Sequence, residues 1–214
     1  MDINTGVGLS EFCYNTYMQN ALERAKKIKA ILTDVDGILT DGKVNFFLQN
    51  GRIEEFKSFN TQDGIAAILC RQAGITLGII TGRRHETTIH RADALGYTYI
   101  YQGFLSKLGP LQDILKRENL TPDQIAYIGD DLTDLPLLQA VGFAATVPAA
   151  VPQVKQAAHF VTARAGGDGA YREIIDFILN AQGKLDTLVQ NAKNGWQLPA
   201  KTQLQIITSQ EGLA

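Results

Sequence analysis

The chain has 214 residues, of which 45% are hydrophobic and 20% charged, and its 20 lysines and arginines against 22 aspartates and glutamates leave a formal net charge of −2. This composition describes a folded protein of about one domain and excludes a disordered chain. The balanced charge also excludes the broad basic surface of a protein that binds nucleic acid or an anionic membrane, so an anionic ligand has to be bound by a local site.

Helical and strand-like segments alternate along most of the chain. An amphipathic helix is expected over Glu11–Lys27, where apolar residues recur every three or four positions. Short apolar runs typical of buried strands follow at 30–34, 76–80, 97–101, 124–128, 142–145 and 159–161. Helical stretches lie between or after them at 63–72, 84–95, 107–118, 132–140 and 169–179. This alternation predicts an α/β fold with a doubly wound, Rossmann-like parallel sheet.

The segment Val44–Phe56 breaks the alternation. It consists of two extended runs on either side of Asn50-Gly51. Both central residues of a type I′ turn need a positive φ, which Asn and Gly tolerate best, so this pair is a strong hairpin signal. We therefore expect a β-hairpin insertion over about 43–59.

Three parts follow from these elements. Residues 1–28 form an N-terminal segment with one helix, residues 29–182 form the α/β domain with its hairpin, and residues 183–214 form a C-terminal tail. The tail shows no clear hydrophobic period, and we expect it to be mobile in the monomer.

The two cysteines and the N-terminus suggest a cytoplasmic protein. Cys13 and Cys70 lie far apart, without the CxxC spacing or clustered histidines of a zinc site or a disulfide framework. The first residues lack the basic flank and apolar run of a secretory signal. No stretch approaches the roughly 20 apolar residues of a membrane span. We expect a protein of the cytoplasm that binds neither nucleic acid nor membrane.

Charged and hydroxyl side chains follow the ends of several predicted strands. They are Asp34, Asp36, Thr81, Lys107, Asp130, Asp131 and Asp134. The carboxyl ends of the strands meet at one edge of an open α/β sheet, where ligands bind, so we expect one shared site there. Carboxylates gathered at one edge repel each other unless a hard cation neutralises them, and Mg²⁺ binds one or two carboxylates together with water and phosphate. The pattern predicts a magnesium phosphate site.

The spacing of these residues suggests a phosphoryl-transfer chemistry. One aspartate after the first strand can attack phosphorus, while the aspartate two residues away protonates the leaving oxygen and later activates water. Thr81 can hold the transferring phosphoryl oxygens, and Lys107 adds positive charge where the transition state is most negative.

The same residues resemble the four motifs of the haloacid dehalogenase phosphotransferase superfamily. The matching strings are Asp34-Val35-Asp36-Gly37, Thr81, Lys107 and Gly129-Asp130-Asp131-Leu132-Thr133-Asp134, in the order of that family. The resemblance implies that Asp34 is the nucleophile and a Mg²⁺ ligand, and that Asp36 is the general acid/base whose backbone carbonyl also binds the metal. It implies Asp130 as the third protein ligand, with Asp131 and Asp134 orienting metal waters and Lys107.

A finer resemblance points to the capless 3-deoxy-D-manno-octulosonate 8-phosphate phosphatases of lipopolysaccharide synthesis. The strings that carry it are 36–42 (DGILTDG), 57–64 (KSFNTQDG), 80–83 (ITGR), 101–103 (YQG) and 166–170 (GGDGA). It implies an acidic sugar phosphate as substrate, whose carboxylate and phosphate favour Arg and Lys partners. The implied substrate contacts are Asp36, Asn60, Thr61, Gln62, Asp63, Gly64, Arg83, Arg91 and Lys107.

The resemblance also implies a homotetramer. Family members that act on small molecules usually shield the site with a cap domain, but the stretch between Asp41 and Asp63 has room only for the hairpin, and no insertion separates Thr81 from Lys107. The hairpin is too apolar for a free two-stranded ribbon. We expect hairpins of neighbouring subunits to pack together and complete each other's sites.

Two other functions stay open at this point. One is a phosphatase for another acidic sugar phosphate, such as a sialic acid 9-phosphate. The other is a non-catalytic oligomerisation module of the same fold, against which the intact set of Asp34, Asp36, Lys107 and Asp130 argues.

Overall fold

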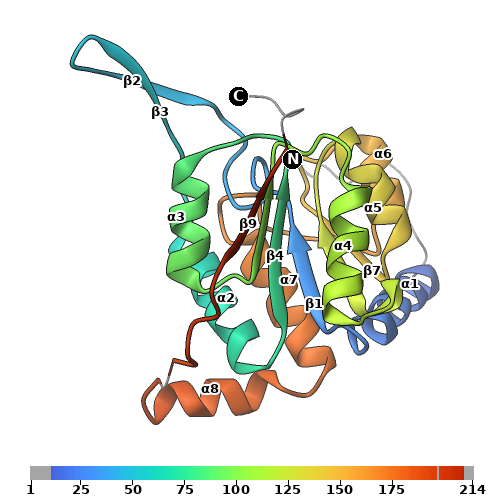
Figure 1. Ribbon diagram of the computed structural model, residues 1–214. Helices are drawn as coiled ribbons and strands as arrows, with labels where there is room; N and C mark the ends of the chain where they lie inside the picture. Colours follow the sequence, from blue (N-terminus) through green and yellow to red (C-terminus); the bar gives the residue numbers. More distant parts are fainter. Residues whose placement is uncertain (1–10, 197, 210–214) are drawn as a thin grey trace, which may run out of the picture.

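The computed structural model describes residues 11–196 and 198–209, and its centre is a sheet of seven parallel strands (Figure 1). The strand order is β8-β7-β6-β1-β4-β5-β9. The strands are β1 (Ala30–Thr33), β4 (Thr76–Thr81), β5 (Tyr99–Gln102), β6 (Ile125–Ile128), β7 (Phe143–Thr146), β8 (Phe160–Val161) and β9 (Gln205–Thr208). Strand order reverses on either side of β1, which pairs with both β4 and β6. The prediction of a doubly wound parallel sheet is confirmed.

Contacts between neighbouring helices divide them into two layers. The first layer comprises α1 (Glu11–Ala25), α7 (Ala170–Ala181), α2 (Thr61–Gln72) and α3 (Glu86–Leu95), and the second comprises α4 (Leu108–Glu118), α5 (Leu135–Ala140) and α6 (Pro152–Ala157). Short 3₁₀ turns cover Pro122–Gln124 (η1) and Leu132–Asp134 (η2). The sequence analysis did not predict α6. No helix in the described ranges is long and apolar enough to cross a membrane.

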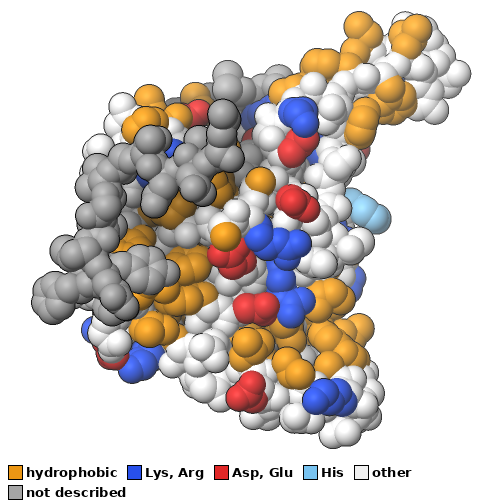
Figure 2. Space-filling view, turned by 180° about the vertical axis from the view of Figure 1, so that it is seen from behind, with side chains coloured by type: hydrophobic (Ala, Val, Ile, Leu, Met, Phe, Trp, Pro, Cys, Tyr) orange, Lys and Arg blue, Asp and Glu red, His pale blue; other side chains and the backbone are white. Residues whose placement is uncertain are grey.

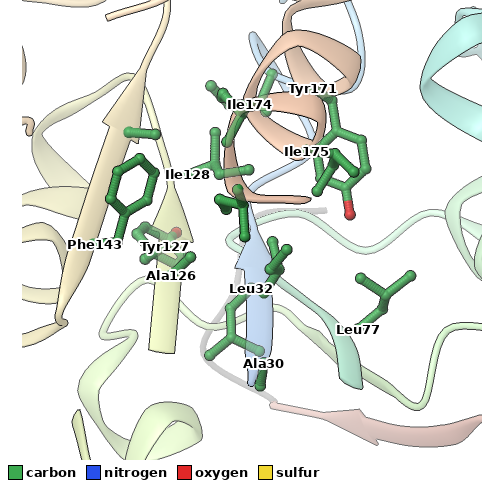
Figure 3. Packing of buried hydrophobic residues seen from close by; sticks show 14 of the residues in the cluster. Ala30, Leu32, Leu77, Ala126, Tyr127, Ile128, Phe143, Tyr171, Ile174 and Ile175 are labelled. Carbon is green, nitrogen blue, oxygen red and sulfur yellow. The ribbon is translucent and has the colours of Figure 1, made fainter. Parts of the chain in front are cut away.

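The core lies on both faces of the sheet, and Figure 3 shows the part next to α7. All four residues of β1 are buried, as expected for a central parallel strand covered on both faces. Ile174 and Ile175 of α7 face the sheet near Ile128 and Leu32 (Figure 3). This packing fixes the central strands, and with them the loops at their carboxyl ends.

The predicted hairpin is present and projects from the body of the molecule (Figure 1). Its strands β2 (Asn45–Gln49) and β3 (Arg52–Phe56) pair with each other and not with the main sheet. Asn50 and Gly51 have φ angles of 52° and 74°, the two positive values that a type I′ turn requires. Apolar side chains cover the projecting ribbon (Figure 2), and 62% of Phe46 and 74% of Leu48 are exposed.

The tail shows no clear hydrophobic period and was expected to be mobile, but its described part contains regular structure. Residues after 182 form helix α8 (Leu185–Lys193) and strand β9, which pairs in parallel with β5 at the edge of the sheet. Arg71 of α2 donates hydrogen bonds to the carbonyls of Pro199 and Ala200 and so holds the connection between them. These contacts join segments far apart in the sequence, so no local hydrophobic periodicity could predict them. Residues 210–214 lie outside the described ranges.

Candidate active site

The loop after β1 brings the first two aspartates to the carboxyl edge of the sheet. The backbone N–H of Asp34 donates to the carbonyl of Ile128 at the end of β6, at 2.9 Å, so the strand pairing continues into the loop. Gly37 follows with a φ of 86°, and a Cβ at this position would lie 2.0 Å from Oδ2 of Asp130. Only a glycine allows the loops after β1 and β6 to approach this closely.

Lys107 joins these loops from the start of α4. Its Nζ lies 3.1 Å from Asp34 Oδ2 and 2.6 Å from Asp134 Oδ1. It also donates to the hydroxyl of Tyr127, at 3.1 Å. Lys107 is 1% exposed and Asp134 is fully buried. The ammonium group is therefore shielded from water and contacts three oxygen acceptors. A buried ammonium is stable only with such partners.

Asp134 is the structural centre of the loop after β6. Its Oδ2 accepts hydrogen bonds from the backbone N–H groups of Asp130 and Asp131, at 3.0 and 3.1 Å, while its Oδ1 faces Lys107. Gly129 makes room for this turn, since a Cβ there would lie 2.3 Å from the Asp134 carboxyl carbon. The expected link between Asp134 and Lys107 is confirmed. Asp131 is exposed, and its carboxylate accepts from the N–H of Leu132.

The carboxylates at this edge are held at high electrostatic cost. The pKa of Asp34 is raised to about 6, mainly because the carboxyl group is buried. Lys107 acts in the opposite direction and lowers this pKa, whereas the charge of Asp134 raises it. Burial likewise raises the pKa of Asp130 to about 7, assisted by Asp34, Asp134 and Asp131. The protein therefore gathers more negative charge here than its own lysine neutralises.

Two observations show that a hard divalent cation fits this site. Within the described residues, carboxylate oxygens of Asp34, Asp130 and Asp134 lie within 4.8 Å of one another. Oδ1 of Asp34 is buried without a hydrogen-bond partner, and a buried polar atom without a partner is costly. An oxygen donor set with excess negative charge is what Mg²⁺ prefers. Because both oxygens of Asp134 already accept hydrogen bonds, Asp34 and Asp130 are the side chains available to the ion.

Asp36 lies beside a group of charges at the base of the hairpin. Its Oδ1 accepts from Nζ of Lys57, the residue directly after β3. Glu55 of β3 binds Arg83 Nη2 at 2.6 Å and lies 3.7 Å from His85 Nε2. Sequence analysis predicted Arg83 as a substrate contact but missed Glu55 and the contact of Lys57 with Asp36.

Thr81 ends β4 at the same edge. Its side chain is buried, and its Oγ1 accepts from the backbone N–H of Arg83 at 3.3 Å. Tyr127, which the sequence analysis also missed, donates from its hydroxyl to Asp134 Oδ1 in the Lys107 cluster. Its position inside a buried strand made it look like an ordinary core residue.

The predicted substrate residues 60–64 lie at the start of α2. Oδ1 of Asn60 accepts from the N–H of Gln62 at 2.7 Å and caps the helix. Gln62 accepts from Arg164 at 2.6 Å, and Thr61 is exposed. Asp63 is buried, and its Oδ1 accepts from the backbone N–H of Arg172 in the first turn of α7. Part of this motif is therefore committed to joining α2 with α7.

Arg91 of α3 reaches the same region. Its Nη2 donates to the carbonyl of Asn60 at 3.2 Å, and its guanidinium lies 5.9 Å from the ring centre of Phe59. Gly64 leaves space for it, because a Cβ there would lie 2.6 Å from Arg91 Nη2. Asn60, Asp63, Gly64 and Arg91 line one small pocket between α2 and α3. The structure thus brings these four predicted substrate residues together, separately from the Lys107 cluster.

The glycine-rich loop 166–169 packs on the loop after β1. A Cβ on Gly166 would lie 1.7 Å from the carbonyl oxygen of Gly37, and the N–H of Gly167 donates to the carbonyl of Ile38 at 2.9 Å. Glycines, without a Cβ, allow a backbone to approach another group closely. The observed close approach is to the same chain, where the loop supports the backbone around Asp36.

Comparisons with known proteins place the chain among one family of hydrolases. A family model of haloacid dehalogenase-like hydrolases matches residues 94–174. The chain is 40% identical over 174 residues to the 3-deoxy-D-manno-octulosonate 8-phosphate phosphatase KdsC of Escherichia coli K12, an alignment that covers 81% of this chain and 91% of that protein.

Solved structures of such phosphatases have the same fold. The enzyme from Moraxella catarrhalis, in complex with a magnesium ion, a phosphate ion and a KDO molecule, aligns with a TM-score of 0.78 at 38% identity, covering 82% of this chain and 99% of that one. The enzyme from Yersinia pestis aligns with a TM-score of 0.74 at 41% identity, covering 78% and 89%.

Proposed function

We propose, from the premise that this chain belongs to the 3-deoxy-D-manno-octulosonate 8-phosphate phosphatases of the haloacid dehalogenase-like hydrolases, that it hydrolyses 3-deoxy-D-manno-octulosonate 8-phosphate to KDO and inorganic phosphate. The chain is a phosphoric monoester hydrolase that uses Mg²⁺. Its reaction contributes to lipopolysaccharide synthesis, because KDO is a sugar of that polymer.

One observation carries the catalytic part of the proposal. Asp34 presents a buried carboxylate oxygen without a protein partner, while its other oxygen is fixed 3.1 Å from Lys107. The unpartnered oxygen is left for the metal ion. A nucleophilic carboxylate needs a fixed orientation and nearby positive charge for the phosphoryl group, and Lys107 gives Asp34 both. A non-catalytic module has no need of such a costly arrangement.

The roles of the other residues follow from their positions. Asp34 attacks phosphorus and forms an aspartyl-phosphate as the bond from phosphorus to the sugar oxygen breaks. Asp36 donates a proton to that sugar oxygen and afterwards takes a proton from the water that cleaves the aspartyl-phosphate. Lys107 and Thr81 stabilise the charge on the phosphoryl oxygens.

Mg²⁺ is held, in this proposal, by the carboxylates of Asp34 and Asp130 and by the backbone carbonyl of Asp36. The bound ion supplies positive charge that neutralises the carboxylates and the substrate phosphate. Asp134 and Asp131 hold the loop that presents Asp130.

The substrate's sugar acid is bound by the residues around the site. We assign the contacts to Asp36 and Lys107 at the phosphate end, and to Arg83, Arg91 and residues 60–64 beyond it. Support comes from the position of Asn60, Asp63, Gly64 and Arg91 side by side between α2 and α3, and from the affinity of guanidinium groups for carboxylate and phosphate.

The assembly we propose is a homotetramer in which neighbouring hairpins pack together and complete the sites. The supporting observation is the exposure of Phe46, Leu48 and Ile53, whose exposed fractions are 62%, 74% and 75%. An isolated ribbon with such a surface is marginal in water.

For the location of the protein we propose the cytoplasm. The supporting observation is Cys70, a free and buried thiol, which suits a reducing compartment.

A phosphate-release assay on a panel of acidic sugar phosphates, with and without Mg²⁺, tests the function. We expect Mg²⁺-dependent release with the highest kcat/KM for 3-deoxy-D-manno-octulosonate 8-phosphate. A higher value for a sialic acid 9-phosphate would reassign the substrate. The absence of any release under Mg²⁺ would favour the non-catalytic module.

A further inference from the structure

The base of the hairpin holds a lysine that the reaction as described does not use. Lys57 follows β3 directly, and its Nζ donates to Oδ1 of Asp36, the general acid/base of the proposed function. The side chain of Lys57 is 3% exposed, in contrast to the exposed strands that precede it. A long cationic side chain that is almost fully buried against one carboxylate has a defined orientation.

A second carboxylate lies near Lys57. Oε1 of Glu55 lies 4.0 Å from Lys57 Nζ, and its other oxygen lies 2.6 Å from Arg83 Nη2. His85 Nε2 is 3.7 Å from Glu55 Oε1. Charges from β3, from the loop after β1 and from the loop after β4 therefore meet in one network. Glu55 lies between Lys57 and Arg83, and Lys57 keeps its contact with Asp36.

We propose that Lys57 is the positioning residue of the general acid/base. By binding Oδ1, its ammonium fixes the rotation of the Asp36 carboxyl group. Within the described residues, Oδ2 has no side-chain hydrogen bond or ion pair. It is therefore free to face the leaving group. This inference rests on the proposed function, because it assigns Lys57 to the proton-transfer step of that reaction.

The step that Lys57 serves is the cleavage of the sugar phosphate. As the bond between Asp34 and phosphorus forms, the bond from phosphorus to the sugar oxygen breaks and its electron pair stays on that oxygen. A proton from Asp36 neutralises it. An alkoxide leaving group depends strongly on this proton, whereas a nitrophenolate leaves without one. The dependence of the rate on the leaving group therefore reports how well Asp36 is placed.

The test compares Lys57→Met with the wild type on esters of increasing leaving-group pKa, from p-nitrophenyl phosphate to alkyl phosphates and the sugar phosphate. The measured quantity is kcat/KM, which reports the steps up to the aspartyl-phosphate. We expect a loss of about 10- to 100-fold on alkyl esters, a fraction of the 10²- to 10⁴-fold contribution of general acids, and a loss below about 3-fold on p-nitrophenyl phosphate. Lys57→Arg should recover most of the loss, because a guanidinium also donates to a carboxylate.

Two further variants sharpen the test. Lys43→Met removes an exposed lysine that pairs with Asp41 nearby, and we expect it to keep the wild-type profile. In an Asp36→Asn background, Lys57→Met should add less than about 3-fold, because both changes act on the same proton transfer. Thermal unfolding of each variant confirms that the fold is retained.

Other outcomes overturn the proposal. An equal loss on all esters, or full additivity with Asp36→Asn, would mean that Lys57 does not act through the general acid. A rise in KM confined to carboxylated substrates would make it a substrate-binding residue instead. Failure of the proposed function looks different, because the wild type itself would then release no phosphate from any ester.

Discussion

The catalytic edge of the sheet, formed by Asp34, Lys107, Asp130 and Asp134, is built in the opposite way to the hairpin. The two regions meet at Lys57. At the edge, charged side chains are buried: Lys107 is 1% and Asp134 0% exposed. On the hairpin, apolar side chains are exposed, including 74% of Leu48. The buried charges are stable because they are paired within the chain, whereas the exposed apolar groups of the ribbon project from the body (Figure 2). The comparison teaches that the charges of the edge find partners within one chain, whereas the apolar surface of the hairpin stays exposed in that chain.

The largest effect is expected from breaking the catalytic edge at its nucleophile. Asp34→Asn should abolish turnover, a loss of several orders of magnitude, because an amide oxygen is a poor nucleophile. The fold should survive, since Lys107 keeps its partner Asp134. Phosphate release and thermal unfolding measure the two effects. Activity within a few-fold of the wild type would show that Asp34 is not the nucleophile.

The next effect tests whether the edge is also a structural element. Within the part of the chain that the structure describes, Asp134→Ala leaves Lys107 with Asp34 as its remaining ionic partner, and it frees two backbone N–H groups. Breaking a buried ion pair costs about 3–5 kcal/mol, so denaturant unfolding should show a loss of that size together with loss of activity. Arg117→Ala, which breaks the exposed pair with Asp113, is the matched control and should cost far less stability. Equal losses in the two variants would contradict the assigned role of Asp134.

A smaller effect concerns the pH dependence of metal binding. The pKa of Asp130 is raised to about 7, so its carboxyl group is protonated below that pH and charged above it. Protons then compete with Mg²⁺, and affinity measured by calorimetry should fall by up to about tenfold for each pH unit below 7. Affinity should level off above pH 8.

Two variants sharpen this pH test. Asp130→Ala should weaken Mg²⁺ binding at every pH and remove the dependence near pH 7. Asp131→Asn takes away one of the charges that raise the pKa of Asp130, so the curve should move to lower pH. A wild-type affinity that stays constant from pH 8 to 6 would contradict Asp130 as a metal ligand.

The smallest effect on chemistry is expected at the hairpin. Phe46→Asp or Phe47→Asp should yield smaller species in analytical ultracentrifugation, because a carboxylate in an apolar interface is costly. KM for sugar acids should rise several-fold, with less change for a small phosphate ester. Gln49→Glu, which adds a charge near the hairpin turn, is the control and should keep the assembly. A fully active wild-type monomer at assay concentration would contradict the shared sites.

Much of the fold could be predicted from local patterns. The alternation of apolar runs and helical periods located β1, β4, β6 and most helices within a few residues. The Asn50-Gly51 pair located the hairpin turn because its φ values are a property of those two residues. The strand predicted at 97–101 begins two residues later, at Tyr99, since the buried Tyr97 extends the apolar run beyond the paired residues.

The candidate site was predicted in its motifs but not in its supports. Asp34, Lys107 and Asp130 converge at the edge of the sheet as the strand order requires. Tyr127 carried no signal, because a tyrosine in a strand is ordinary in sequence. Lys57 opens one of the strings that carry the family resemblance, but nothing in the sequence indicated its contact with Asp36. Lys57 lies 21 residues from Asp36, and only the return of the hairpin brings the two side chains together.

By itself, the sequence determined the features that depend on neighbouring residues: the elements, the turn of the hairpin and the order of the catalytic motifs along one sheet edge. The tertiary structure alone decided which side chains pair across that edge. It also decided that Asp63 accepts a hydrogen bond from the first turn of α7 and that the tail adds β9 to the sheet. The physical reason is range. Periodicity and turn preference arise from backbone geometry over a few residues, whereas burial and ion pairing depend on which distant segments packing brings into contact.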